Sequence, residues 1–234
     1  MADEVVGFQR ARRPEQVKLR RNTILDTAAA MLAERPVAEI SLRELSDRVG
    51  LAKSNVLRYF DSREAIFLEV LDATWTTWLD GVEVELGAAV EPGNPAPYQR
   101  ETRVATLIAD SLSKQPLLCE LISTMVGTLE RNISLDSART SKRRAAANTD
   151  RLTDLVRAQL PHLGRPAAAH FAGAALVLVA GLWPSVAPTE AVATVTAELG
   201  APPAEVSFPH DLREALANQL IGLSVRATLA PEHP

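Results

Sequence analysis

One short stretch of the chain carries side chains whose types and spacing suit the recognition of base pairs. It contains Lys53, Ser54, Asn55, Leu57 and Arg58. Arginine can donate two hydrogen bonds to the O6 and N7 atoms of guanine, asparagine can pair with adenine, and lysine can reach phosphate or guanine. A leucine offers apolar contact to a thymine methyl group. If one helix presents all five side chains on its outer face, that helix can read the major groove of DNA.

The residues around this stretch predict the two short helices that would position it. Ser41 and Glu44 form a capping box, which starts a helix. Gly50 supplies a residue that can adopt the left-handed conformation where that helix must end. A third helix is expected over Lys53–Phe60. Two short helices joined by a tight turn that contains glycine make a helix-turn-helix, whose second helix enters the major groove.

Apolar spacing predicts how these helices pack. The inward contacts come from Leu45, Val49, Leu51, Val56 and Phe60. Ser46 is the small side chain needed where the two helices cross. Before them, a first helix is expected over residues 18–35, because Ile24, Ala28, Met31 and Leu32 form one helical stripe. After them, Asp61 and Glu64 predict a second capping box and the start of a long fourth helix.

The run GLAKSNVLRYF over residues 50–60, followed by DSREAI over residues 61–66, resembles the DNA-binding domain of the TetR family of transcriptional repressors. The preceding segment RNTILDTAAAMLAE is similar to the first helix of that family. The resemblance covers about residues 18–68 and is highly specific there. It implies a homodimer that binds a palindromic operator in double-stranded DNA, and a pocket in an all-helical C-terminal domain whose small-molecule effector weakens DNA binding.

The resemblance also implies roles for individual residues. The base-reading and groove-lining positions are Lys53, Ser54, Asn55, Leu57 and Arg58. The positions that usually hold phosphates are Tyr59 and Arg63, and the contacts to the DNA backbone from the second helix are Ser41 and Arg43. Ala52 stands where the family often has a serine that caps the third helix, a difference that costs about 1 kcal/mol.

The net charge of the whole chain disfavours nucleic-acid binding, but the charge is unevenly distributed along the chain. The 234 residues carry 25 Lys and Arg against 29 Asp and Glu, a net charge of −4. Residues 1–66 hold 12 basic and 10 acidic side chains, a net of +2, and the remainder holds 13 and 19, a net of −6. Because binding responds to the local field, this asymmetry favours a DNA-binding segment at the N-terminus.

The remaining chain predicts a larger all-helical domain. Helices are expected at about residues 99–114, 117–131, 137–160, 167–186, 190–199 and 211–229, after a loop over residues 87–97. The apolar helix Ala168–Ala187 and the leucine-lined terminal helix are candidates for a dimer interface, or for packing within one subunit. The predicted domains are therefore an arm over residues 1–16, a helix-turn-helix domain over 17–65, and a ligand-binding and dimerisation domain over 66–234.

Large or soft side chains in the C-terminal helices are candidates for the ligand pocket, although each is more often plain core. They are Trp75, Trp78, Cys119, Met125, His170, Phe171 and Trp183. For His170, the favoured interpretation is a histidine in the core whose ring is hydrogen-bonded to a neighbour. Lys142, Arg143 and Arg144 are interpreted as a solvated face, and Arg10, Arg12 and Arg13 as a charged tail or an arm that reaches the minor groove.

Several function classes are excluded or disfavoured. A single cysteine forms no internal disulfide, and the four histidines lack zinc-ligand spacing, so no metal or cofactor is expected. No catalytic triad or phosphate loop supports an enzyme. The N-terminus lacks the apolar run of a secretory signal, and the uncharged stretch 171–187 falls short of a membrane span, so a cytoplasmic protein without membrane insertion is expected. A DNA-binding dimer without a small-molecule inducer, controlled by a protein partner or by abundance, is the alternative.

Overall fold

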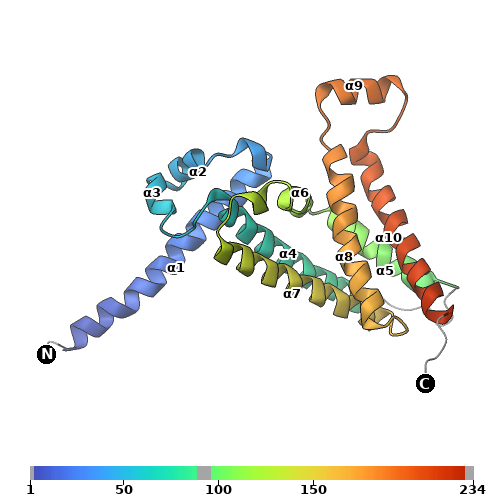
Figure 1. Ribbon diagram of the computed structural model, residues 1–234, viewed down its shortest axis with the longest axis horizontal. Coiled ribbons are helices and arrows are strands. Elements are labelled where there is room, and N and C mark those ends of the chain that lie inside the picture. The colour runs from blue at the N-terminus through green and yellow to red at the C-terminus, as the bar shows by residue number, and fades with distance from the viewer. Residues whose placement is uncertain (1–2, 89–95, 230–234) are drawn as a thin grey trace.

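The computed structural model describes residues 3–88 and 96–229, and the part it describes is all-helical (Figure 1). This confirms the predicted fold class. The helices are α1 (Asp3–Glu34), α2 (Leu42–Val49), α3 (Lys53–Val56), α4 (Arg63–Ala88), α5 (Gln99–Ser113), α6 (Pro116–Met125), α7 (Leu135–Gln159), α8 (Arg165–Leu182), α9 (Glu190–Glu198) and α10 (Ala204–Leu229). Short 3-10 turns cover Val37–Glu39, Leu129–Arg131 and Trp183–Ser185.

Helices α1, α2 and α3 enclose a small apolar core at one end of the molecule (Figure 1). Ile24 and Ala28 of α1, Leu45 of α2 and Val56 of α3 are all 0% exposed. Ser46 is also buried, and its hydroxyl donates to the Leu42 carbonyl at 2.7 Å, so it fits where the helices cross without an unsatisfied polar group. The predicted inward stripe therefore holds the three helices together, and we call this unit the head (residues 17–62).

Helix α2 begins and ends as the sequence predicts. The Ser41 hydroxyl accepts from the Glu44 backbone N–H at 3.2 Å, and a Glu44 carboxylate oxygen accepts from the Ser41 backbone N–H at 2.9 Å. Gly50 closes the helix with φ 74° and ψ 32°, a left-handed conformation that favours glycine. The reciprocal hydrogen bonds lower the pKa of Glu44 to about 2, first through the Ser41 backbone and hydroxyl and then through Arg35.

Glu44 is expected to stay ionised in the folded protein well below its ordinary pKa of 4.5. Because its folded pKa is depressed, its stabilising contribution is complete above pH 4.5 and is lost as the pH falls toward 2. A carboxyl NMR titration measures this directly. The Ser41→Ala variant removes the hydroxyl hydrogen bond and keeps the backbone one, so it should move the pKa of Glu44 part of the way back toward 4.5. An unchanged pKa in that variant would rule out the Ser41 hydroxyl as one of its causes.

The start of α4 differs from the predicted capping box of Asp61 and Glu64. The N-cap is Ser62, whose hydroxyl accepts from the Ala65 backbone N–H at 3.1 Å. Asp61 instead accepts from the backbone N–H of Ser134 at 3.0 Å, and Glu64 binds the side chain of Arg63. Serine and aspartate are both good N-caps, so the sequence could not separate adjacent candidates, and a contact with a residue far along the chain decided between them.

Helix α1 is longer than predicted, since it extends back to Asp3 and contains Pro14. Residues 3–16 of the expected arm, and its boundary with the head, therefore fall within one helix, and residues 1–2 lie outside the described part. Apart from Pro14 and Gly7, the segment Asp3–Gln16 is composed of residues that a helix tolerates, and a proline costs one backbone hydrogen bond without forcing the helix to stop. The side chains of Arg10, Arg12 and Arg13 lie outside the described part.

The C-terminal helices form the larger body of the molecule. Helices α4 and α7 run side by side through its centre, and α5, α8 and α10 pack together at its far end (Figure 1). Helix α4 starts at the head and ends in the body, so it joins both parts. The buried core continues from the head into the body, where Trp75, Phe171 and Leu216 are at most 2% exposed. Arg213 on α10 pairs with Asp110 on α5 at 2.7 Å.

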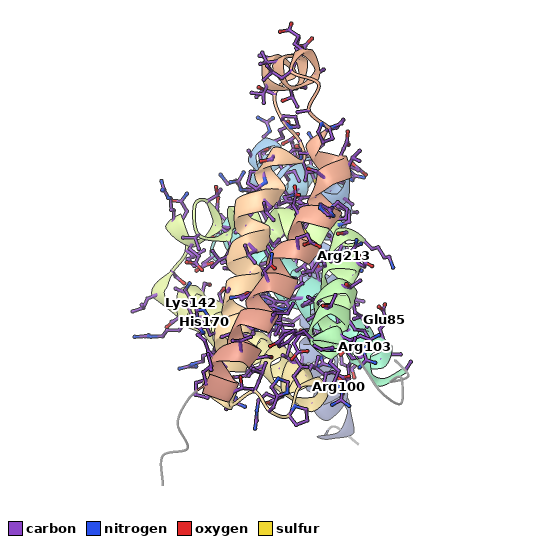
Figure 2. All side chains as sticks on the ribbon, turned by 90° about the vertical axis from the view of Figure 1, so that its right-hand side faces the viewer. Glu85, Arg100, Arg103, Lys142, His170 and Arg213 are labelled. Atoms are coloured by element: carbon purple, nitrogen blue, oxygen red, sulfur yellow. The ribbon has the colours of Figure 1, made fainter. Side chains whose placement is uncertain are left out.

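Helix α8 leaves an apolar face uncovered. Together with the following turn it is long and apolar enough to cross a membrane, yet only 28% of its most apolar window is buried within this chain. Val177, at its centre, is 71% exposed. Figure 2 faces this side of the molecule, where α8 and α10 lie next to each other. A helix that is apolar all round needs burial on every side, so a further surface is required to cover α8.

Helix α9 projects beyond the ends of α8 and α10 (Figure 1). The predicted short helix at residues 190–199 is confirmed as Glu190–Glu198, and none of its residues is buried. Helix α10 starts earlier than predicted, at Ala204, and includes Pro209.

Candidate functional site

The outer face of α3 presents the predicted base-reading side chains to solvent. Its inner residue, Val56, is fully buried, and the exposed members of the set are Lys53, Ser54, Asn55, Leu57 and Arg58. The α-helix itself spans only Lys53–Val56, and the chain continues to Phe60 as turns whose backbone hydrogen bonds include Phe60 N–H to the Val56 carbonyl at 3.2 Å. The five side chains therefore share one surface, in a helical element small enough to enter a major groove.

Ser41 and Arg43 lie at the start of α2, the helix that packs against α3. Both are exposed. The Arg43 side chain is 89% exposed and only approaches Asp47, at 4.0 Å, so its guanidinium remains available to a DNA phosphate. The Ser41 hydroxyl donates to the Glu44 carboxylate at 2.8 Å within the capping box, so a phosphate contact from this hydroxyl would have to replace that bond and stays a prediction.

Tyr59 and Arg63 are more enclosed. Tyr59 packs against the head core and is half-buried. The Arg63 guanidinium donates to the Ile40 carbonyl at 2.6 Å and to Glu64 at 2.7 and 3.1 Å, and it lies 5.6 Å from the centre of the Phe67 ring. Its contacts lie within the chain, so its main visible role is to join the head to α4, and a phosphate contact from Arg63 stays a prediction.

Adding a cap to α3 is expected to stabilise the head. Ala52 has the extended backbone of an N-cap (φ −63°, ψ 144°) but no side chain that can accept a hydrogen bond. The Ala52→Ser variant should raise the free energy of unfolding by about 1 kcal/mol. Urea unfolding measures it, with Ala146→Ser on the exposed side of α7 as the control that should not stabilise. A serine at residue 52 that gives no increase would show that the cap geometry is not used.

The seven candidate ligand residues separate into three groups. Trp75 and Met125 line a cavity. Trp78, Cys119 and Phe171 are buried in the body, where the Trp78 indole donates to the Ser111 hydroxyl at 3.0 Å and burial raises the pKa of Cys119 to about 12.

The third group lies nearer the surface. Trp183 is half-buried, donates to Glu120 at 3.2 Å and stacks edge-on with Phe208. His170 is exposed on α8, on the side of the molecule that Figure 2 faces, so its interpretation as a core histidine is wrong. His170 and Phe171 are neighbours in α8, and the buried face of the helix contains Phe171, so His170 points away from the core.

The cavity lies where the head meets the body, and we call it the junction cavity. Its volume is about 340 Å³, within the range of small-molecule sites. Its wall consists of Arg21, Tyr59, Phe60, Asp61, Ala65, Leu68, Glu69, Leu71, Asp72, Trp75, Met125, Ser134, Asp136, Ser137, Thr140, Ser141, Arg144, Ala145 and Asn148. Arg144 is thus not part of a solvated face: it pairs with Asp72 at 3.5 Å. Sequence reasoning missed this site because its wall is assembled from distant segments.

Comparison with known proteins decides the family. A model described as bacterial regulatory proteins, tetR family, matches residues 24–70, and one described as tetracyclin repressor-like, C-terminal domain, matches residues 72–227. The chain belongs to the TetR family of transcriptional regulators. The resemblance predicted from residues 18–68 is confirmed, and the second match extends it over most of the body. TetR-family proteins are DNA-binding regulators rather than enzymes.

Individual TetR relatives are distant. The chain is 35% identical over 78 residues to the HTH-type transcriptional regulator EthR of Mycobacterium tuberculosis, a match that spans 33% of each chain. Among solved structures it is similar to the fatty acid degradation regulator FadR from Bacillus halodurans (TM-score 0.53, 11% identity, 87% of this chain and 95% of that one). It is also similar to FadR from Bacillus subtilis in complex with stearoyl-CoA (TM-score 0.51, 12% identity, 84% and 97%). At such low identities, the structural similarity to the two FadR proteins shows a shared fold alone.

Proposed function

We propose that this chain is a homodimeric transcriptional repressor that binds a palindromic operator through α3 and is released when a small molecule binds to the C-terminal domain. The proposal keeps the predicted domains, residues 17–65 for DNA and 66–234 for effector and dimer, with action in the cytoplasm. The observation that carries it is the uninterrupted exposed face of α3, on which Lys53, Asn55 and Arg58 stand over a fully packed head.

The charge distribution supports DNA contact at the head. The basic side chains that face solvent over α2, α3 and the turns after α3 are Arg43, Arg48, Lys53 and Arg58. Arg48 pairs with Glu34 at 2.6 Å, and the other three lie on the predicted DNA-binding surface. The acidic excess lies in the body, away from α3. With a net charge of only +2 over residues 1–66, affinity must depend on a few placed contacts in each subunit.

Selection of bound sequences from a random DNA pool tests the proposal. We expect the selected sites to be palindromic, with half-site centres about one helical turn apart or a multiple of that spacing. Fluorescence anisotropy then gives the affinity and stoichiometry for the selected site. A pool that yields no preferred sequence, or sites without two-fold symmetry, would refute a dimeric repressor that reads DNA through α3.

The uncovered faces of α8 and α10 are the surfaces that we assign to the dimer. Two helices from each subunit would form a four-helix interface. We expect Val177→Arg to convert the dimer to monomers, because it places a charge at the centre of the apolar face. Sedimentation velocity measures the result, and Val84→Arg on α4, where the valine is also 71% exposed, is the matched control. If both variants dissociate the dimer equally, or if neither dissociates it, this interface is excluded.

The alternative, a DNA-binding dimer without a small-molecule inducer, has one observation in its favour. Trp78, Cys119 and Phe171, three of the seven candidate ligand residues, are at most 4% exposed and belong to the packed core. The junction cavity favours the inducible repressor over this alternative, and a search for ligands of that cavity distinguishes the two.

A further inference from the structure

Two side chains on the wall of the junction cavity carry buried hydrogen-bond donors that the described part of the chain does not satisfy. Trp75 is 2% exposed, and its indole Nε1 is buried without an acceptor in the described part of the chain. Arg21 has the same deficit at one guanidinium nitrogen, Nη1, while Nη2 binds Glu69. A buried donor without a partner costs about 1–3 kcal/mol, so both groups favour an occupant that brings acceptors.

Each carboxylate on the cavity wall already has at least one partner within the chain. Asp61 accepts from the Ser134 backbone N–H at 3.0 Å, and although burial raises its pKa, hydrogen bonds from Ser134 and Ser137 lower it below the ordinary value. The other carboxylates are also paired: Glu69 with Arg21 and Arg144, Asp72 with Arg144 at 3.5 Å and Asn148 at 3.2 Å, and Asp136 with Arg139 at 3.1 Å. The buried side-chain atoms of this wall that lack a partner in the described part of the chain are therefore both donors, Trp75 Nε1 and Arg21 Nη1.

Charge restricts the occupant further. Four carboxylates line the cavity, those of Asp61, Glu69, Asp72 and Asp136, against two guanidinium groups. An anionic ligand would meet a wall with an excess of two negative charges, although its oxygen atoms would suit the donors. A cationic ligand would suit the charge but would leave Trp75 and Arg21 without acceptors. An uncharged acceptor meets both conditions.

The apolar side chains of the wall can contact the apolar body of such a ligand. Leu68, Leu71 and Trp75 line it from α4, and Met125 closes it from the end of α6. Ala145 on α7 has a side chain small enough to leave space opposite them. The wall therefore combines an apolar floor with two donors, which is the usual composition of a small-molecule site.

We propose that the junction cavity is the effector site, and that it takes an uncharged small molecule with an apolar body and a carbonyl or ether oxygen, which accepts from Trp75 and Arg21. This inference rests on the proposed function and assigns its ligand site and ligand class. Arg21 belongs to α1 in the head, whereas Trp75 and Ala145 belong to the body, so the occupant contacts both parts. Binding there changes how the head is held relative to the body and thereby couples the ligand to DNA.

The test uses the uncharged naphthyl ketone Prodan as the probe and its emission shift as the measure of binding to the full chain. We expect Trp75→Phe to weaken Prodan binding about two- to tenfold, because one hydrogen bond to the ketone is lost. Trp75 and Trp78 are both buried, so each Trp→Phe variant loses core volume and should lower the unfolding midpoint, and the two variants differ in their effect on Prodan binding. Trp78→Phe is the matched control: it removes the bond to Ser111, lowers the midpoint, and leaves Prodan binding unchanged.

Two further comparisons locate the probe and its charge preference. Ala145→Leu fills the cavity and should abolish Prodan binding, whereas Ala146→Leu, at the next residue on the exposed side of α7, should not. The anionic dye anilinonaphthalene sulfonate should bind to the cavity more weakly than Prodan does. The part of its binding that Ala145→Leu abolishes is the part that belongs to the cavity. Equal Prodan affinity in Trp75→Phe and wild type, equal effects at residues 145 and 146, or tighter binding of the sulfonate in the cavity would overturn the inference.

Selected operator DNA separates this inference from the proposed function. Prodan should lower the affinity for that DNA, and by linkage the DNA should lower the affinity for Prodan by the same factor. If the operator binds but Prodan in the cavity leaves its affinity unchanged, the effector site is refuted and the DNA-binding function stands. If no operator is selected, the proposed function fails whatever the cavity binds.

Discussion

Replacing Arg58 with alanine is expected to weaken operator binding by the homodimer by about 2–6 kcal/mol. A bidentate contact between arginine and guanine contributes about 1–3 kcal/mol, and a palindromic site loses one such contact in each half. The Arg58 side chain is exposed, so its loss leaves the head core unchanged. The effect therefore belongs to DNA recognition and should not appear in the stability of the protein.

Anisotropy titrations with the selected operator and with each single-base variant of it measure this effect. The Arg58→Ala protein should lose its preference at one base pair in each half-site and keep it at the others. Arg157→Ala, a half-exposed arginine on α7 in the body, is the control that should bind as wild type. Unchanged affinity and unchanged base preference in the Arg58 variant would remove Arg58 from the reading face.

Replacing Arg63 with alanine is expected to destabilise the fold by about 3 kcal/mol. The Glu64 carboxylate is 8% exposed and pairs with Arg63 at 2.7 Å, so the variant would leave a buried charge without a partner and the Ile40 carbonyl without its donor. Breaking a buried ion pair on one side costs about 3–5 kcal/mol, and the 21% exposure of the Arg63 side chain places the value at the low end.

Urea unfolding distinguishes this structural role from the phosphate contact that the family resemblance implies. The double variant Arg63→Met with Glu64→Gln removes both charges and should be more stable than Arg63→Ala alone, because no ion remains unpaired. A phosphate contact without a structural role predicts the opposite pattern: an unchanged unfolding midpoint for Arg63→Ala, with weaker and less salt-dependent DNA binding.

The head was predictable because its determinants are local. The capping box of Ser41 and Glu44, the glycine at residue 50, and the alternation of buried and exposed residues around Val56 all act over a few positions of chain. Local signals also located the helices of the body, although α10 starts seven residues before the predicted position and α6 ends six residues before its predicted end. Where two local signals competed, as at Asp61 and Ser62, the outcome depended on Ser134, which no local pattern identifies.

The placement of side chains in the body was less predictable. Trp75 and Trp78 lie one turn apart on α4, and residue type alone made both candidates for a ligand site. Only their tertiary surroundings differ: Ser111 satisfies one indole, and the other remains without an acceptor at the junction cavity. The cavity joins Arg21 to residues on α4, α6 and α7, so its existence follows from packing rather than from spacing in the sequence.

Helix α4 joins the head to the body without a break, and this continuity gives the molecule a lever. Its 26 residues, at 1.5 Å each, make a rod about 39 Å long. If the rod tilts by about 5° around its end in the body, its first turn and the attached head move by about 3.4 Å, the rise of one base pair. A small tilt of α4 in the body thus becomes, at the reading face, a displacement as large as the spacing between neighbouring base pairs.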